Sequence, residues 1–109
     1  MLSVDEVNFD AEVIDATGPV LLVFMADWCP ACQAYKPQLE LFTERHGDKV
    51  KVCIVDADVS VAIKQYYGVM DIPSTFLFLN GEEKRELQSG GWDYEYIVEF
   101  VEHVLETKL

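Results

Sequence analysis

The sequence predicts an α/β sandwich, because apolar strands alternate with amphipathic helices and a β-hairpin and a last helix follow. The run Val20–Met25 contains no polar residue and is typical of a central strand that is covered on both faces. Half of the 109 residues are hydrophobic, which is enough for one compact core. We therefore expect residues 1–109 to form a single domain.

The N-terminal segment fits two local structures. The motif Ser3-x-x-Glu6 matches a helix capping box, whereas Leu2–Val4 also matches a short edge strand. Apolar residues at helical spacing over 8–16 then predict a short amphipathic helix, which a Gly-Pro pair ends.

A longer helix is predicted after the central strand. Pro30 suits its first position, and apolar residues at helical spacing extend it over 30–46. Pro37 lies inside this helix and should kink it, because proline has no N–H to donate. A β-branched run predicts a strand over 50–55, and the short helix predicted over 59–67 ends at the glycine that follows.

A hairpin and a helix are predicted for the rest of the chain. Asn80-Gly81 is a strong signal for a tight turn between strands over 75–79 and 83–88. Asp93 is the expected N-cap of the last helix. The buried side of that helix is predicted from apolar residues at helical spacing, namely Ile97, Val98, Val101, Val104 and Leu105.

The charge of the chain argues against polyanionic partners. Twenty acidic and eight basic residues give a net charge of -12, which repels phosphate backbones and anionic lipid. We therefore expect no nucleic-acid or membrane partner, and a bias toward basic or neutral protein surfaces. The longest apolar run is too short to cross a bilayer, and no segment resembles a signal peptide. We expect a cytoplasmic protein that is a monomer.

Two closely spaced cysteines carry the predicted chemistry. Cys29 and Cys32 lie one turn apart at the start of a predicted helix, close enough to form a disulfide. Unsatisfied N–H groups and the helix dipole favour the thiolate of Cys29, which is therefore the expected nucleophile. Cys32 lies deeper in the helix and can attack the mixed disulfide that Cys29 forms. It is the expected resolving thiol.

A zinc site is another interpretation of a Cys-x-x-Cys motif. A closed site needs about four ligands, and only Cys53, His46 and His103 remain, at scattered positions. We therefore predict no metal site. Cys53 lies inside a predicted strand and is expected to be a small buried residue with no catalytic role. The two histidines are expected at a helix end and on an exposed helical face.

Several motifs together resemble the thioredoxin family over nearly the whole chain. They are the segment Ala-Asp-Trp-Cys-Pro-Ala-Cys at 26–32, Pro37, Ile72-Pro73-Ser74, Asn80-Gly81-Glu82 and Gly90-Gly91. The resemblance implies a thioredoxin fold, in which helices flank a central mixed β-sheet and the redox disulfide lies at an exposed edge. It implies no cofactor beyond the Cys29–Cys32 disulfide.

The resemblance also assigns residues to substrate binding. Pro73 matches a family proline in the cis form that faces the disulfide. Ile72, directly before it, would present its backbone to an extended substrate segment. The other predicted substrate-binding residues are Trp28, Pro30, Ala31, Gly90 and Gly91.

The sequence departs from the family pattern around the cysteines. Common thioredoxins carry Gly-Pro between them, whereas Pro30-Ala31 is similar to glutaredoxins and periplasmic thiol oxidases, so the redox potential stays open. The family's buried aspartate and lysine are expected at Val23 and Val52, so the usual proton acceptor of the second cysteine is missing. A shift of one residue in the second strand would instead bring Lys51 to this place.

From the resemblance we expect a protein-disulfide reductase that passes electrons from a reductase, such as thioredoxin reductase, to the disulfides of target proteins. A protein-disulfide oxidase or isomerase is the nearest alternative; Pro30 favours it, and it would need an oxidising compartment. A thioredoxin-fold interaction module, whose cysteines only regulate docking, is a second alternative. The intact set of Cys29, Cys32 and Pro73 argues against such a module.

Overall fold

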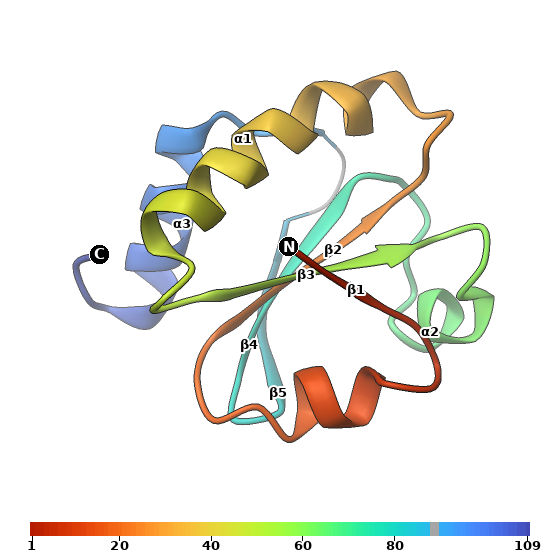
Figure 1. The fold of residues 1–109 in the computed structure, drawn as a ribbon, viewed down its shortest axis with the longest axis horizontal. Coiled ribbons are helices and arrows are strands. Elements are labelled where there is room, and N and C mark those ends of the chain that lie inside the picture. Colours follow the sequence, from red (N-terminus) through yellow and green to blue (C-terminus); the bar gives the residue numbers. More distant parts are fainter. Residues whose placement is uncertain (88–89) are drawn as a thin grey trace.

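The computed structural model describes residues 1–87 and 90–109, and a five-stranded sheet forms its centre (Figure 1). The strand order is β1-β3-β2-β4-β5. The strands are β1 (Leu2–Val4), β2 (Val20–Met25), β3 (Lys51–Asp56), β4 (Ser74–Leu79) and β5 (Glu82–Leu87). β1, β3 and β2 are parallel, whereas β4 runs antiparallel to both of its neighbours. The predicted α/β fold with a central mixed sheet is therefore confirmed.

Helices cover both faces of this sheet (Figure 1). The long helix α1 (Pro30–His46) and the last helix α3 (Tyr94–Leu105) lie on one face. The short helix α2 (Val61–Tyr66) and a π-helical segment, η1 (Asp10–Ile14), lie on the other. The chain thus forms three layers, with β2 in the middle of the sheet.

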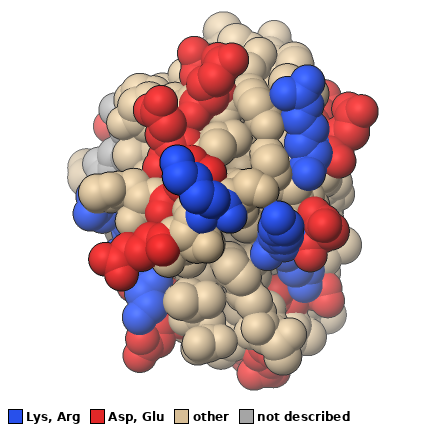
Figure 2. Space-filling model, turned by 90° about the vertical axis from the view of Figure 1, so that its left-hand side faces the viewer, with Lys and Arg blue, Asp and Glu red and all other residues tan. Residues whose placement is uncertain are grey.

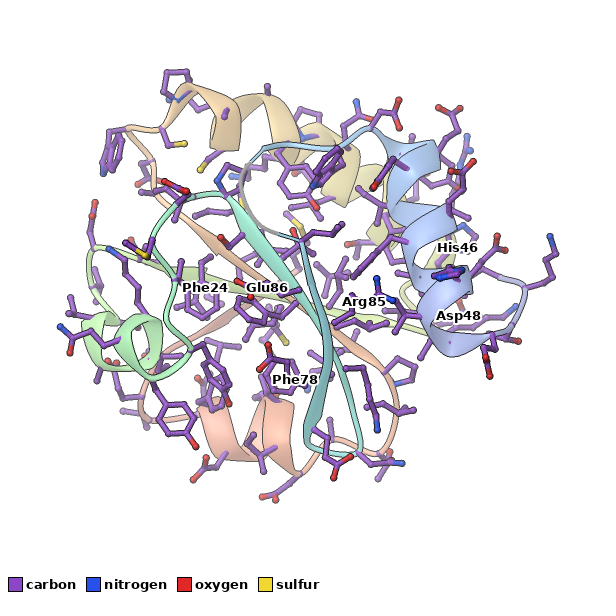
Figure 3. The ribbon with its side chains drawn as sticks, turned by 180° about the vertical axis from the view of Figure 1, so that it is seen from behind. Phe24, His46, Asp48, Phe78, Arg85 and Glu86 are labelled. Carbon is purple, nitrogen blue, oxygen red and sulfur yellow. The ribbon has the colours of Figure 1, made fainter. Side chains whose placement is uncertain are left out.

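Two apolar cores result from the alternation of side chains along the strands. In β2, Leu21 and Val23 pack toward α1 and α3, whereas Leu22 and Phe24 pack toward α2 and η1. Phe24 and Phe78, which Figure 3 labels, both belong to the core on the α2 and η1 side of the sheet. Because both faces of β2 are buried, all six of its residues are buried, as its continuous apolar sequence predicts.

The N-terminal segment adopts the strand alternative, since Leu2–Val4 pairs with β3 at the edge of the sheet. The helix predicted over 8–16 is present as the five-residue π-helical segment η1. Pro37 lies inside α1, which continues on both sides of it. The kink at Pro37 stays a prediction.

Turn residues end the elements where the sequence predicts. Gly68 follows α2 with a φ of +65°, and Asn80 and Gly81 join β4 to β5 with φ values of +53° and +79°. A tight hairpin turn of this kind requires positive φ at both central residues. A Cβ atom at Gly81 would lie 2.6 Å from the carbonyl oxygen of Ile14, so only glycine fits there. The predicted end of β5 at Gln88 lies outside the described residues.

Helix α3 begins at its predicted cap. The backbone N–H of Tyr96 donates to Asp93 Oδ1 at 2.8 Å, which satisfies one of the free N–H groups of the first turn. Of the predicted buried side, Ile97 and Val101 are fully buried. The other predicted members are half-buried, namely Val98, Val104 and Leu105. This side packs against α1.

Candidate redox-active site

The turn between β2 and α1 places Cys29 at the edge of the sheet where the parallel strands β2 and β3 end. Cys29 is the N-cap of α1, with an extended backbone (φ -84°, ψ 113°), and Pro30 follows at the first helical position. Cys29 Sγ accepts a hydrogen bond from the backbone N–H of Cys32 at 3.2 Å. The sulfur therefore takes the place of the side-chain oxygen that usually caps a helix, at its positive end.

The sulfur of Cys29 has a second polar neighbour from the loop before β4. Its thiol donates to the carbonyl oxygen of Ile72 at 3.8 Å. The Ile72–Pro73 peptide bond is cis, and Pro73 is buried. The prediction of a cis bond is confirmed, and the Ile72 carbonyl lies beside Cys29. That the Ile72 backbone binds substrate stays a prediction.

Both sulfurs of the motif are free thiols and both residues are buried. Cys29 is 5% exposed and Cys32 is 1% exposed, so Cys29 is the more accessible of the two. The expectation of a disulfide at an exposed edge is only partly met, because the Cys29 sulfur turns inward to the N–H of Cys32 and the carbonyl of Ile72. Trp28, directly before it, is 65% exposed.

The environment of Cys32 strongly favours its protonated form. Burial, reinforced by a side-chain hydrogen bond with Cys29, raises the pKa of the Cys32 thiol to about 12. Near neutral pH this thiol is protonated, whereas attack on a disulfide requires the thiolate. Cys32 must therefore lose a proton to some acceptor before it can act.

The strand register corrects one predicted pair. Val23 of β2 lies opposite Ile54 of β3, whereas Val52 lies opposite Leu21. The prediction that Val23 and Val52 are partners is wrong by two residues, because an apolar β-branched strand carries no local signal of its register. Both possible partners are apolar, so a buried aspartate–lysine pair is absent from these positions in either register.

Lys51 does not reach the cysteines either. It pairs with Val20 at the opposite end of β2. Its Nζ donates to the backbone oxygen of Glu12 at 2.8 Å and to Glu12 Oε2 at 3.2 Å. The lysine therefore joins β3 to η1 rather than serving the site.

Other predicted contact residues surround the cysteines to different degrees. Pro30 and Ala31 are exposed at the start of α1. A Cβ atom at Gly91 would lie 2.8 Å from Tyr35 Cβ and 3.0 Å from the oxygen of Ala31, so this glycine allows the chain to approach α1 closely. Gly90 has a φ of +121° and open space where a side chain would point. That the glycines bind substrate stays a prediction.

Two side chains at the site were not identified from the sequence. The indole Nε1 of Trp28 donates to Asp58 Oδ2 at 2.6 Å, and Gln33 Nε2 donates to the backbone oxygen of Asp27 at 2.7 Å. The first contact holds the turn between β2 and α1 against the loop after β3, and the second joins this turn to the first part of α1. The available signal was that aspartates follow β3 directly, because parallel strands end at the same edge of a sheet.

The remaining cysteine and the histidines lie away from the motif. Cys53 is fully buried in the core on the α2 side, and burial raises the pKa of its thiol to about 11. His46 is the last residue of α1, and its Nε2 is 2.7 Å from the hydroxyl of Tyr94. His103 is exposed on α3. Within residues 1–87 and 90–109, no three His, Cys, Asp or Glu side chains form a group that could hold a metal ion.

Taken together, an N-capping thiol, a buried second thiol one turn on and a cis-proline loop beside them, on a mixed sheet, define a thiol–disulfide exchange protein. The thioredoxin family model matches residues 1–103, and the chain belongs to the thioredoxin family. Members of this family are thiol-disulfide oxidoreductases.

Known proteins similar to this chain include thioredoxins from bacteria and plants. A thioredoxin of Rickettsia bellii is 37% identical over 82 residues, which is 75% of this chain and 78% of that protein. A thioredoxin of Alicyclobacillus acidocaldarius is 35% identical over 86 residues, covering 79% of this chain and 81% of that one. The chloroplastic thioredoxin M5 of Oryza sativa is 36% identical over 83 residues, 76% of this chain but only 48% of its own length.

The chain therefore spans about half of the chloroplast relatives and more than two thirds of the bacterial ones. In the part of the chain that the structure describes, no helix is long and apolar enough to cross a membrane.

Proposed function

We propose that this chain is a protein-disulfide reductase in which Cys29 is the nucleophile and Cys32 the resolving thiol. The observation that carries the proposal is the unequal placement of the two sulfurs. Cys29 Sγ lies at the positive end of α1 and accepts a hydrogen bond from the backbone N–H of Cys32. Cys32 lies one turn further into the helix and is only 1% exposed, compared with 5% for Cys29. Burial raises the pKa of the Cys32 thiol to about 12, and Cys29 is the more accessible sulfur, so Cys29 is placed to attack first.

In the first step, the Cys29 thiolate attacks one sulfur of the target disulfide. A bond forms between Cys29 Sγ and that sulfur, and the disulfide of the target breaks. The other target sulfur leaves with the bonding electron pair and takes up a proton. The product is a mixed disulfide between Cys29 and the target.

In the second step, Cys32 loses its proton and attacks Cys29 Sγ. The Cys29–Cys32 disulfide forms and the bond to the target breaks, so the second target sulfur leaves as a thiolate and is protonated. The target has gained two electrons and two protons, and the cysteine pair has lost them. The chain needs no cofactor for this beyond its own cysteines.

The surface next to Cys29 suits an extended protein segment. The Ile72 carbonyl lies 3.8 Å from Cys29 Sγ, and the exposed ring of Trp28 is fixed by Asp58. Pro73, Pro30, Ala31, Gly90 and Gly91 complete the proposed contact surface. A target would lie along this loop with its disulfide over Cys29.

The proposed electron donor is a thioredoxin reductase, which returns two electrons and two protons to the Cys29–Cys32 disulfide. The proposed compartment is the cytoplasm, because a dithiol is maintained where the surroundings are reducing. Relatives with chloroplastic names show that the family also occurs in a plastid. We further propose that the chain acts as a monomer on disulfide-containing proteins.

A coupled assay tests the reductase function. Insulin is incubated with this chain, thioredoxin reductase and NADPH, and consumption of NADPH is followed with time. We expect rapid, catalytic NADPH consumption that stops in the Cys29→Ser variant. A rate equal to that of Cys29→Ser would overturn the proposal.

Pro30 supports a second candidate, a protein-disulfide oxidase. Proline occupies the first helical position directly beside the nucleophile. The same preparation, with the cysteine pair oxidised, is therefore mixed with a reduced, unfolded protein. If the oxidised chain transfers its disulfide to the unfolded protein at a much higher rate than the reduced chain reduces insulin, the oxidase function is favoured.

A further inference from the structure

A cavity of about 560 Å³ lies behind the second cysteine. Its walls come from the ends of parallel strands, from α1 and from the loop before α2. The lining includes Cys32 and Lys36 of α1, Met25 and Asp56 at the ends of β2 and β3, and Ser60. The cavity therefore joins the buried thiol to residues outside the redox motif.

Asp56 lies on the same side of the sheet as Cys32. Ile54, two residues earlier in β3, packs against the core that contains Cys32, and side chains two residues apart in a strand share a face. Met25, which also packs in that core, is the register partner of Asp56. The backbone N–H of Asp58 donates to Asp56 Oδ1 at 2.9 Å, which orients the carboxylate.

The wall of the cavity also contains a buried hydroxyl group. Ser60 is 1% exposed, and its Oγ has no hydrogen-bond partner among the described residues. Buried polar groups usually have a partner, and water supplies it where a polar cavity is large enough. The Ser60 hydroxyl itself is closed to solvent, but a cavity of this volume has room for several water molecules.

The second step of thiol–disulfide exchange needs a proton acceptor. The residues next to the cysteine motif in the sheet, Val23 and Ile54, are apolar and cannot accept a proton. The Cys32 thiol is held protonated by burial. Among the described residues that line the cavity with Cys32, three carry carboxylates, namely Asp5, Asp27 and Asp56.

We propose that this cavity is the route by which the Cys32 proton leaves, with water in the cavity as the carrier and the Asp56 carboxylate as the acceptor. The Cys32 S–H bond breaks and the proton passes to water and then to Asp56. The sulfur keeps the electron pair and attacks Cys29 Sγ in the mixed disulfide. The target thiolate leaves, and Asp56, which is exposed, releases the proton to solvent.

Charged groups on every wall bear on this route. Lys36 projects from α1, Asp27 from the β2–α1 turn, and Asp5 and the amino group of Met1 come from the ends of β1. Asp58 contacts Asp56 from the same loop. Lys36 and Asp56 therefore line one cavity from α1 and from the end of β3.

The test uses a chromogenic disulfide, 5,5′-dithiobis(2-nitrobenzoate), in stopped-flow with the reduced chain. Attack by Cys29 releases one thionitrobenzoate and leaves the other on Cys29; attack by Cys32 releases the second. Cys53 is fully buried and does not compete. The two phases thus report Cys29 and Cys32 separately in one trace.

In Asp56→Asn we expect the rate of the second phase to fall about tenfold near neutral pH. This loss is smaller than the loss on removal of a general base in direct contact with the thiol, because here water carries the proton to Asp56. The first phase should be unchanged. The difference should shrink as the pH rises from about 7 to about 9, because hydroxide takes over as acceptor. Asparagine keeps an oxygen for the N–H of Asp58, and Asp56→Glu, which restores a carboxylate, should recover most of the rate.

Asp48→Asn is the matched control, since it removes the same charge. Figure 3 shows Asp48 beside His46 at the end of α1, on the far side of the molecule from the start of that helix. If the second phase has the same rate in Asp56→Asn and in Asp48→Asn over the whole pH range, the inference is overturned. An Asp56→Glu rate no faster than that of Asp56→Asn would overturn it as well.

This inference rests on the exchange chemistry in the proposed function, but its test is independent of targets and electron donors. A small reagent replaces the target protein. If the reductase proposal is wrong, the insulin assay shows no turnover, while both phases of the stopped-flow reaction are still seen. If this inference is wrong, the rate of the second phase does not depend on Asp56.

Discussion

At the scale of single residues, the two cysteines of one motif have different environments. Cys29 caps α1 and receives an N–H, whereas Cys32 is enclosed by the helix and the sheet. Burial raises the pKa of Cys32 to about 12, which disfavours its reaction with outside disulfides and agrees with the resolving role that we propose for it. The order that we propose for the two exchange steps therefore rests on the different burial of the two thiols and on the hydrogen bond between them.

This asymmetry predicts which variant traps a target. Cys32→Ser should accumulate a mixed disulfide between Cys29 and the target, because no thiol remains to resolve it. Cys29→Ser should show neither turnover nor trapping, and Cys53→Ala should turn over normally because Cys53 lies on the other side of the sheet. Non-reducing gel electrophoresis after mixing with insulin measures the adducts. Equal trapping by Cys29→Ser and Cys32→Ser would contradict the assignment.

At the scale of elements, the pairing of β2 with β3 determines what lies beneath the motif. Val23 and Ile54 are opposite each other and pack in the core with both cysteines of the motif. The strands are apolar on this face until Asp56, where β3 ends. On the side of the sheet that faces Cys32, the first carboxylate of β3 therefore lies at the C-terminal end of the strand, not in its middle.

Strand register predicts a specific coupling between substitutions. Val23→Asp should destabilise the fold by several kcal/mol, since it buries an unpaired charge or forces the carboxyl to stay protonated. Ile54→Lys in the same molecule should recover part of this loss through pairing. Val52→Lys is the control: it lies opposite Leu21 and should recover less.

A double-mutant cycle with denaturant unfolding measures both couplings. A larger coupling between positions 23 and 52 than between 23 and 54 would show that the register is wrong. A neutral Val23→Asp would show that this part of the core is hydrated.

At the scale of the whole molecule, charge is unevenly distributed between the surface and the interior. All but a few of the buried residues are apolar, so the net charge of -12 lies almost entirely on the surface. Figure 2 shows the side away from the β2–α1 turn, where Lys and Arg side chains are interspersed with Asp and Glu and form no continuous basic stripe. That face offers a polyanion no extended positive surface.

The buried thiols make the stability of the reduced protein sensitive to alkaline pH. The pKa of Cys32 is raised to about 12 and that of Cys53 to about 11, so above the unfolded thiol pKa of about 8.5 the folded chain holds more protons than the unfolded one. The unfolding free energy should therefore be constant below that pH and fall above it. By about pH 10 each thiol should remove about 2 kcal/mol.

Urea unfolding between about pH 7 and about pH 10 measures this effect. The oxidised protein is the control, since its Cys29–Cys32 disulfide does not titrate, and Cys53→Ala removes the remaining contribution. A reduced protein whose stability rises over this range would contradict the assigned directions.

Sequence reasoning located elements well where local chemistry decides them. The Asn80-Gly81 turn, the Asp93 cap and the Cys29–Pro30 start of α1 each depend on neighbouring residues, and each is found as predicted. The partner of Val23 could not be found in this way, because valine and isoleucine fit either register and pairing depends on distant segments.

The cavity behind Cys32 was beyond prediction for a related reason. Its walls come from three strand ends, a helix and two loops, and the lining spans residues 1–60. Asp56 looks like an ordinary surface aspartate until the parallel pairing of β2 and β3 brings it to the same edge as the cysteine motif.

The most direct test of the reductase account is the midpoint potential of the Cys29–Cys32 couple, measured by equilibration against glutathione or dithiothreitol buffers. A reductase requires a strongly reducing pair, so we expect a value near the roughly -270 mV known for thioredoxin. A value near about -120 mV, as in a strong periplasmic oxidant, would contradict the account and assign the chain to disulfide formation instead.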